Sequence, residues 1–132
     1  RPMSTDLGNR VLPCLLVSDM RRSLDFYIEK LGFTQTGYYP IESDPIRTEV
    51  RRDGVAIILY SEAFRGGDGP PAFSGALYVF PTSVDRLADE LRGKVPFAWG
   101  PENTDYDMRE FAIRDPDCYT IVFAERSRSE SS

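Results

Sequence analysis

The sequence predicts an α+β fold made of two βαβββ modules, whose curled mixed sheets form a cleft. The first observation behind this prediction is an internal repeat: residues 52–59, a turn followed by an apolar strand, have a counterpart at 116–123, 64 residues later. The second is that a strand, a helix and further strands are expected ahead of each copy. Residues at equal offsets in the two copies are therefore expected to face the cleft together.

The first module is expected to span about residues 8–64. Ser18-Asp19 can cap a helix in which apolar side chains recur at helical spacing, and Gly32 occupies the position that ends such a helix. A hairpin turn is expected at Asp53-Gly54. Apolar and alternating runs predict strands at 11–17, 33–39, 46–52 and 55–60.

Residues 65–73 form the expected linker, because Gly and Pro crowd this segment. The same glycines do not suit a phosphate-binding loop, since no Lys-Ser or Lys-Thr pair follows them. The second module is expected at about 74–126, followed by a polar tail at 127–132, all within a single domain, 1–132. Its helix is capped at Thr82-Ser83. Strands are expected at 76–80, 97–99, 108–114 and 120–124, with a loop at 100–103.

Composition narrows the range of partners. The 132 residues are 41% apolar and suffice for one domain but not for two. The net charge of −5 opposes attraction to phosphate, so no nucleic-acid partner is expected, whereas a cationic or neutral small molecule suits the charge. No apolar run approaches the roughly 20 residues that cross a bilayer, so we expect no membrane partner and a cytoplasmic protein.

The residue types used in common catalytic and metal sites are scarce. Histidine is absent, which removes the commonest metal ligand and the commonest general base. Cys14 and Cys118 are expected to be reduced, buried thiols rather than a disulfide. Cys118 is expected to be a turn residue and not a nucleophile, because no histidine is present to activate it.

Four segments stand in a characteristic order: 11–19 (VLPCLLVSD), 23–27 (SLDFY), 31–33 (LGF) and 108–117 (MREFAIRDPD). Together they resemble the vicinal oxygen chelate superfamily over nearly the whole chain, and the Arg-Asp-Pro-Asp turn at 114–117 is its most recognisable signature. That family includes glyoxalase I, extradiol dioxygenases, fosfomycin-resistance enzymes and bleomycin-resistance proteins. The resemblance also implies a homodimer, because relatives of this size commonly complete their clefts with a second chain.

In the enzymes of that family, His, Gln or Glu side chains from the first, fourth, fifth and eighth strands usually hold a divalent metal. The resemblance places these positions on Leu12, Ile58, Ala76 and Val122, and the two pairs keep the offset of the repeat. Four hydrocarbon side chains offer no oxygen, imidazole or thiolate donor. The resemblance therefore implies a member with no metal at the usual place, and no cofactor is expected.

A second departure from the family lies at Cys118, where relatives commonly have Gly. That Gly usually accepts a positive φ, which a Cys side chain resists. We expect either mild strain or a shifted turn at this position.

The cleft face is expected to be apolar and partly aromatic, suited to a flat or bulky organic molecule. Strand alternation puts Tyr78 and Phe80 on the face of Ala76, and Tyr60 on the face of Ile58. The alternative is that such aromatics are ordinary sheet core. The expected ligand-lining residues are Leu12, Tyr38, Tyr39, Ile58, Tyr60, Ala76, Tyr78, Phe80, Trp99, Tyr106, Glu110 and Val122.

Glu110 is the charged member of this set. The resemblance places it on the cleft face with Ala112, where a carboxylate on an apolar floor would either keep its proton or await a cation. The alternative is an ion pair with an arginine, for which the candidates are Arg109, Arg114 and Arg51. The acidic loop residues Glu42, Asp44, Glu102, Asp105 and Asp107 would form either a negative rim or ordinary solvated charge.

Three functions follow from these observations, and the missing metal ligands favour the first. It is a metal-free, dimeric binder of a drug-like, cationic or aromatic molecule, resembling the bleomycin-resistance proteins and acting by sequestration, with no catalytic residue. The second is a glyoxalase-like lyase or isomerase, or a dioxygenase-related enzyme, with a non-standard site, for which Glu49, Glu110 and tyrosines could supply acid-base groups. The third is a structural protein whose cleft only joins two chains.

Overall fold

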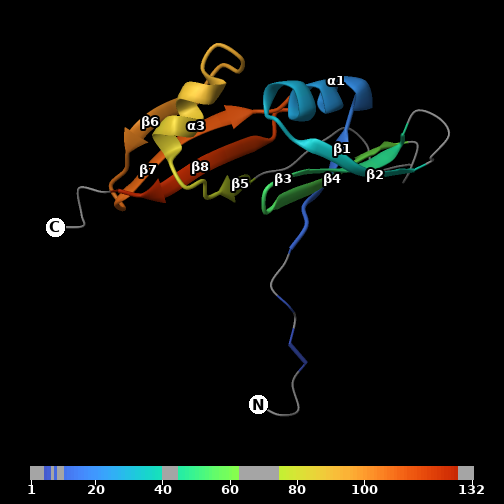
Figure 1. Ribbon diagram of the computed structural model, residues 1–132, viewed down its shortest axis with the longest axis horizontal. Helices are drawn as coiled ribbons and strands as arrows, with labels where there is room; N and C mark the ends of the chain where they lie inside the picture. Colours follow the sequence, from blue (N-terminus) through green and yellow to red (C-terminus); the bar gives the residue numbers. More distant parts are fainter. Residues whose placement is uncertain (1–4, 7, 9–10, 40–44, 63–74, 128–132) are drawn as a thin grey trace.

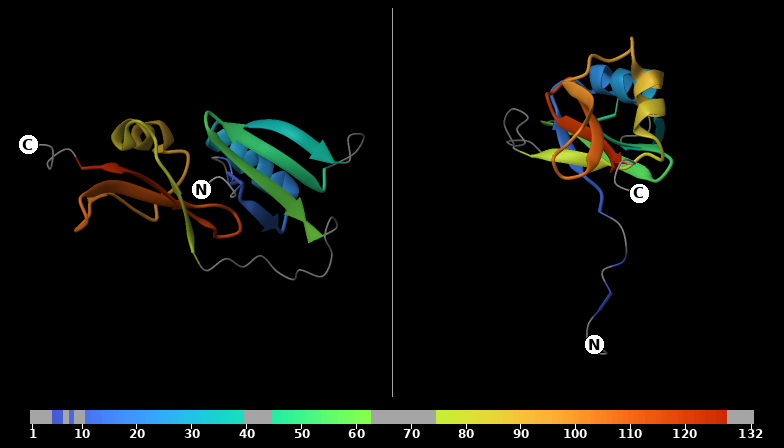
Figure 2. Two further views of the ribbon diagram at one scale, coloured as in Figure 1. Left: turned by 90° about the horizontal axis from the view of Figure 1, so that it is seen from below. Right: turned by 90° about the vertical axis from the view of Figure 1, so that its left-hand side faces the viewer.

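The computed structural model describes residues 5–6, 8, 11–39, 45–62 and 75–127. Two four-stranded mixed sheets follow one another along the chain, and each has helical structure on one face (Figure 1). In the view from below, the first sheet lies in front of α1, so the sheet face turned away from the helix is the one seen (Figure 2). The predicted α+β fold of two modules is confirmed, whereas the expected linker at 65–73 lies outside the described residues.

The first module has its strands in the order β1-β4-β3-β2, with β1 parallel to β4 and the other neighbours antiparallel. The helix begins as expected, because the Asp19 carboxylate accepts the Arg22 N–H at 3.1 Å. Its second half is π-helical, and Gly32 follows it at φ +78°. The elements are β1 (Cys14–Val17), α1 (Met20–Leu24), η1 (Asp25–Lys30), β2 (Thr34–Tyr39), β3 (Arg47–Arg52) and β4 (Val55–Ser61).

The second module repeats this topology in the order β5-β8-β7-β6. Ser83 caps its helix by accepting the Arg86 N–H at 3.2 Å. The expected strand at 97–99 and loop at 100–103 are wrong: the strand begins at Trp99 and includes residues 100–103, where a register shift between Trp99 and Glu102 accommodates Pro101 at a bulge. The elements are β5 (Ala76–Val79), α3 (Val84–Leu91), β6 (Trp99–Asn103), β7 (Met108–Arg114) and β8 (Thr120–Arg126).

The internal repeat is visible in the register of the strands. Cys14 lies opposite Ile58 in the first sheet, and Tyr78 lies opposite Val122 in the second, at the offset of 64 residues seen in the sequence. The two parallel strand pairs are therefore equivalent residue by residue.

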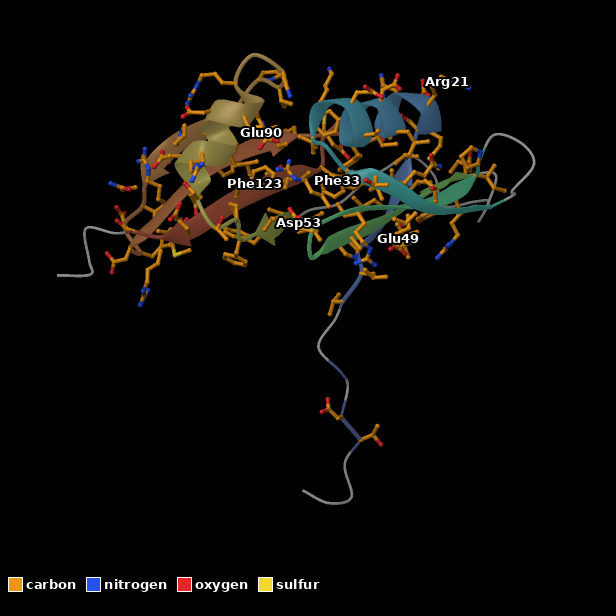
Figure 3. All side chains as sticks on the ribbon, in the orientation of Figure 1. Arg21, Phe33, Glu49, Asp53, Glu90 and Phe123 are labelled. Atoms are coloured by element: carbon orange, nitrogen blue, oxygen red, sulfur yellow. The ribbon has the colours of Figure 1, made fainter. Side chains whose placement is uncertain are left out.

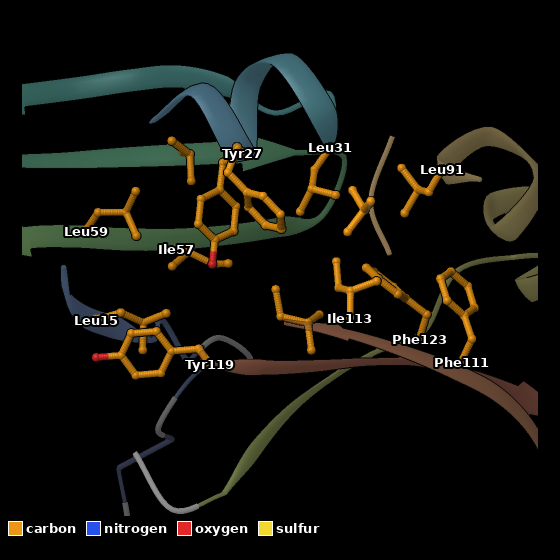
Figure 4. Packing of buried hydrophobic residues seen from close by; sticks show 14 of the residues in the cluster. Leu15, Tyr27, Leu31, Ile57, Leu59, Leu91, Phe111, Ile113, Tyr119 and Phe123 are labelled. Atoms are coloured by element: carbon orange, nitrogen blue, oxygen red, sulfur yellow. The ribbon is translucent and has the colours of Figure 1, made fainter. Parts of the chain in front are cut away.

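One hydrophobic core runs through the described parts of both modules, between the sheets and the helices. Tyr27 and Leu59 of the first module and Phe111 and Ile113 of the second are among its most deeply buried side chains. Figure 4 shows these residues in one continuous layer. No helix in the described part of the chain is long and apolar enough to cross a bilayer.

The turn that follows β7 fastens the second module to the first. Asp115 in this turn is buried, and its Oδ2 accepts the Tyr27 hydroxyl from η1 at 2.8 Å. Its Oδ1 accepts the main-chain N–H groups of Asp117 and Tyr119 at 2.9 and 3.0 Å. The carboxylate thus shapes its own turn and holds a helix of the other module.

Two further contacts complete this attachment. The Ser18 hydroxyl, between β1 and α1, donates to the Asp117 carboxylate at 2.6 Å. The Tyr119 hydroxyl donates to the main-chain carbonyl of Leu16 in β1 at 2.8 Å. We call the set Ser18, Tyr27, Asp115, Asp117 and Tyr119 the module clamp.

Candidate functional site

Each sheet has one face against the core and a second face turned away from the helices, which we call the open face. On the second sheet, β7 and β8 place a row of buried residues on the open face: Glu110, Ala112, Val122 and Ala124. Beside this floor, Tyr78 and Phe80 are 49% and 67% exposed, with ring centroids 6.2 Å apart. Exposed large aromatics at the edge of a buried floor are typical of a binding surface.

Glu110 is the polar member of this floor. It pairs with Ala124 on β8 and with Glu102 on β6, and strand alternation puts it on the face of Ala112. The side chain is 3% exposed. Its Oε1 accepts the Tyr106 hydroxyl at 3.0 Å, while its Oε2 is buried and has no hydrogen-bond partner in the described structure.

The alternative of an ion pair between Glu110 and an arginine is not found in the described part of the chain. Arg109 points to the other face and pairs with Asp85 at 3.0 Å. Arg51 pairs with Glu49 at 2.8 Å in the first module. These two cations are therefore engaged by other carboxylates.

Tyr106 stands over Glu110 from the turn between β6 and β7, and its side chain is 59% exposed. The hydrogen bond to Glu110, followed by one involving the Tyr78 hydroxyl, raises the pKa of Tyr106 to about 12. At neutral pH the phenol therefore keeps its proton and serves as a donor to the carboxylate. The hydrogen-bonded pair Tyr106 and Glu110 lies at the edge of the apolar floor, close to Tyr78.

The open face of the first sheet carries both apolar and charged residues. Ile58 and Tyr60 on β4 are half-buried, and Leu16 beside them is buried. Glu49 lies opposite Ile58 and Arg47 lies opposite Tyr60. Figure 3 shows Glu49 on the side of the sheet away from α1.

The structure distributes the ligand-lining residues predicted from the sequence over two surfaces. Seven of them belong to the second sheet or its rim: Ala76, Tyr78, Phe80, Trp99, Tyr106, Glu110 and Val122. The first sheet carries Ile58 and Tyr60, and Leu12 lies just ahead of β1. Trp99 lies opposite Ala112, on the face of Glu110. Tyr38 and Tyr39 end β2, but their side chains lie outside the described part.

The two cysteines differ from expectation in their burial. Both are free thiols, but both are exposed: Cys14 begins β1 on its open face, and Cys118 lies in the turn before β8. The turn is not shifted, since Cys118 takes the positive φ, +68°, that a Gly would take. The hydrocarbon side chains at the positions of the family's metal ligands provide no donor, and the described residues contain no group of three or more His, Cys, Asp or Glu able to hold a metal.

Sequence reasoning missed a cavity of about 780 Å³ at the junction of the modules. Phe33 from the first module and Phe123 from the second form apolar walls, and Figure 3 shows both rings in the space between the modules. At its rim, Arg52 donates to Glu90 at 3.0 Å and to the main-chain carbonyl of Leu31 at 2.7 Å. No sequence signal marks this cavity, because its walls meet only through the placement of one module against the other.

Comparison with known proteins agrees with the fold. Residues 9–123 match the family model of the Glyoxalase/Bleomycin resistance protein/Dioxygenase superfamily. The chain is 26% identical, over 141 residues, to bleomycin resistance proteins of Geobacillus stearothermophilus and Staphylococcus aureus, which covers 89% of this chain and 97% of each relative.

Solved structures show the same architecture. TnmS3, an antibiotic binding protein from Streptomyces sp. CB03234, has a TM-score of 0.76 at 24% identity, covering 94% of this chain and 100% of that one. A superfamily member from Sphaerobacter thermophilus has a TM-score of 0.74 at 20% identity, covering 91% and 98%. The family match extends over both sheets and over the Arg-Asp-Pro-Asp turn that carries the module clamp. The chain therefore belongs to the glyoxalase/bleomycin resistance protein/dioxygenase superfamily, the vicinal oxygen chelate superfamily.

Proposed function

We propose that this protein binds a small, drug-like organic molecule, cationic or aromatic, and acts by sequestering it in the cytoplasm without a metal. The observation that carries the proposal is the open face of the second sheet, where exposed Tyr78, Phe80 and Tyr106 border a buried apolar floor. Stacking on aromatic rings and burial against aliphatic side chains need no catalytic group. The similarity to bleomycin resistance proteins supports this function, since those relatives cover nearly the whole chain.

The proposal includes a homodimer. In a single chain, Tyr78 and Phe80 leave large apolar surfaces exposed on one face. A second chain lying over this face would enclose a ligand between two surfaces, as a pocket for an organic molecule requires. Light scattering at micromolar concentration should give twice the chain mass of 15.0 kDa. A monomer mass would contradict this part of the proposal.

A thermal-shift screen tests the binding function. Chelator-treated protein is heated with cationic and aromatic antibiotics, including bleomycin and mitomycin, and separately with divalent metals. A ligand that binds the native state raises the melting temperature by mass action, so a drug-dependent increase without metal is expected. Stabilisation by a metal alone, or conversion of a bound compound detected by mass spectrometry, would favour the glyoxalase-like enzyme instead.

Two variants locate the site. Phe80→Ala removes an exposed ring on the open face, and it should reduce the ligand-induced shift, measured from the variant's own unliganded melting temperature. Phe33→Leu alters the wall of the junction cavity and serves as the control. If Phe33→Leu abolishes the shift and Phe80→Ala does not, the ligand occupies the junction cavity and not the open face.

A further inference from the structure

We propose that the ligand of the open face carries an N–H-bearing cation, a protonated primary or secondary amine or a guanidinium, which donates to Oε2 of Glu110. This inference rests on the proposed binding function and adds to it the chemical group that is recognised. It makes Glu110 the residue that selects an aromatic ammonium over a neutral aromatic compound.

The Glu110 carboxylate has hydrogen-bond acceptor positions that the described residues do not fill. A carboxylate has about four acceptor positions, and burying one without partners is costly. Within the described structure, Glu110 is 3% exposed and receives one hydrogen bond, from Tyr106 to Oε1. Its Oε2 is buried without a partner. A donor arriving with the ligand would satisfy that oxygen.

No neighbouring protein group donates to Oε2 of Glu110 in the described structure. Tyr106 already gives its proton to Oε1, and Arg109 lies on the other face with Asp85. Arg114 and Arg126 share the open face with Glu110, but both are exposed and neither forms an ion pair with it in the described structure. Glu102, directly opposite on β6, adds a second carboxylate at this point of the sheet. The surroundings therefore favour a cation from outside the chain.

Aromatic side chains border the Glu110 carboxylate. Tyr78 and Tyr106 present exposed rings beside the carboxylate, and the faces of such rings attract cations. Tyr106 lies in the turn between β6 and β7 and is mostly exposed, so the ring next to Glu110 is not held by core packing. An aromatic body stacked on these rings would place an attached ammonium group next to Glu110.

A cation of a second copy of this chain is the competing occupant. Arg47 pairs in the first module with the equivalent of the residue that Glu110 pairs with in the second: Arg47 lies opposite Tyr60, Glu110 lies opposite Ala124, and Ala124 is 64 residues after Tyr60. If Arg47 of a second copy reached Glu110, the variant Glu110→Gln would weaken the dimer, but it would not change the preference for one ligand over another. The two occupants therefore predict different results.

The experiment compares three probes that share one aromatic body: naphthylmethylamine, naphthylmethanol and trimethyl(naphthylmethyl)ammonium. The wild-type protein should bind the amine on the order of tenfold more tightly than the alcohol, as expected for a hydrogen bond to a charged group. It should also prefer the amine to the quaternary compound, which has the charge but no N–H. Equal binding of these two cations would overturn the inference on wild-type protein alone.

The variant Glu110→Gln keeps the shape of the side chain and removes its charge. Its affinities for amine and alcohol should fall within about twofold of each other, through loss of amine binding only. Glu102→Gln is the matched control, because it neutralises the exposed carboxylate opposite, and it should keep most of the preference. A preference that survives in Glu110→Gln, or a dimer mass lost in that variant, would overturn the inference.

Loss of selectivity and loss of binding are separate outcomes. If the amine and the alcohol bind equally well, small-molecule binding stands and the role of Glu110 is wrong. If neither naphthyl compound raises the melting temperature of the wild-type protein, the inference is contradicted. If the antibiotics of the thermal-shift screen also fail to raise it, the binding function is contradicted as well.

Discussion

Two buried carboxylates in the second module are satisfied to different extents. Asp115 receives hydrogen bonds from the Tyr27 hydroxyl and from two main-chain N–H groups. Burial raises the pKa of Asp115, and these three hydrogen bonds act in the opposite direction. Glu110 receives one hydrogen bond, from an exposed tyrosine. The first carboxylate is held by structure, whereas the second has capacity left for a ligand.

Removing the Tyr27 hydroxyl should destabilise the fold. Tyr27→Phe keeps the fully buried ring but leaves Asp115 without its side-chain donor, so the free energy of unfolding should fall by about 1–3 kcal/mol. Urea denaturation measures this change. Tyr78→Phe, which removes an exposed hydroxyl, is the control and should change stability much less. Equal effects of the two variants would show that the Asp115 contact contributes nothing measurable.

The tyrosines of the module clamp should make the fold sensitive to high pH. Burial and the Asp115 carboxylate raise the pKa of Tyr27 well above its usual 10.0, and burial raises the pKa of Tyr119 to about 12. The folded chain therefore keeps protons that the unfolded chain loses above pH 10, so stability is full below that pH and falls as pH rises further. Unfolding curves at pH 9 to 11 test this, and Tyr119→Phe should reduce the slope.

The family resemblance placed Glu110 on the face of Ala112, and the pairing of β7 with β8 agrees with this placement, because the side-chain period of a strand is fixed at two. The burial of Cys14 was predicted wrongly for a related reason. Composition says that a free cysteine is usually buried, but it does not say which face of a strand lacks a covering layer. Cys14 lies on the open face of the first sheet, which the described chain leaves uncovered.

At the scale of elements, the sequence predicted the helix caps and turns correctly, but it did not predict one strand, β6. Asp19 and Ser83 cap their helices as expected, because a short polar side chain just ahead of a segment with helical apolar spacing commonly accepts a main-chain N–H of the first turn. Gly100-Pro101 indicated a loop, since a proline cannot donate in a sheet ladder. The bulge in β6 resolves this conflict, and its cause lies in the pairing with β7, which the local sequence does not contain.

Gly100 should be intolerant of any side chain. It has φ +80°, and a Cβ atom there would lie 2.4 Å from the main-chain oxygen of Glu110. Gly100→Ala should therefore lower the free energy of unfolding by more than about 1 kcal/mol and weaken ligand binding, because it disturbs the strand that carries Glu110. Gly54→Ala is the control, since its Cβ meets nothing within 4 Å. Similar melting temperatures for the two variants would contradict this prediction.

At the scale of the whole molecule, the internal repeat predicted the two modules but not how they meet. The repeat is a property of each half, whereas the module clamp and the junction cavity depend on contacts between halves separated by long stretches of sequence. The Asp-Pro-Asp turn was recognisable as a family signature. Its role in joining the modules became apparent only when Ser18 and Tyr27 were found at its side chains.

A double-mutant cycle on Ser18→Ala and Asp117→Asn should detect energetic coupling between the modules. The pair is partly exposed, so we expect a coupling energy of about 0.5–1 kcal/mol from urea denaturation. The surface pair Asp89 and Arg92, which lies within one module, is the control and should show a smaller value. A Ser18–Asp117 coupling no larger than this control would mean that the contact is incidental.

The position of the module clamp has a consequence for how this fold can change its ligand. Its members lie in turns and on η1, and none of them belongs to the floor or rim of the second sheet. Substitutions at the exposed rim residues Tyr78, Phe80 or Tyr106 therefore leave the attachment between the halves untouched. A library randomised at these positions should yield mostly folded proteins with altered specificity, which makes the chain a suitable scaffold for the directed evolution of new small-molecule receptors.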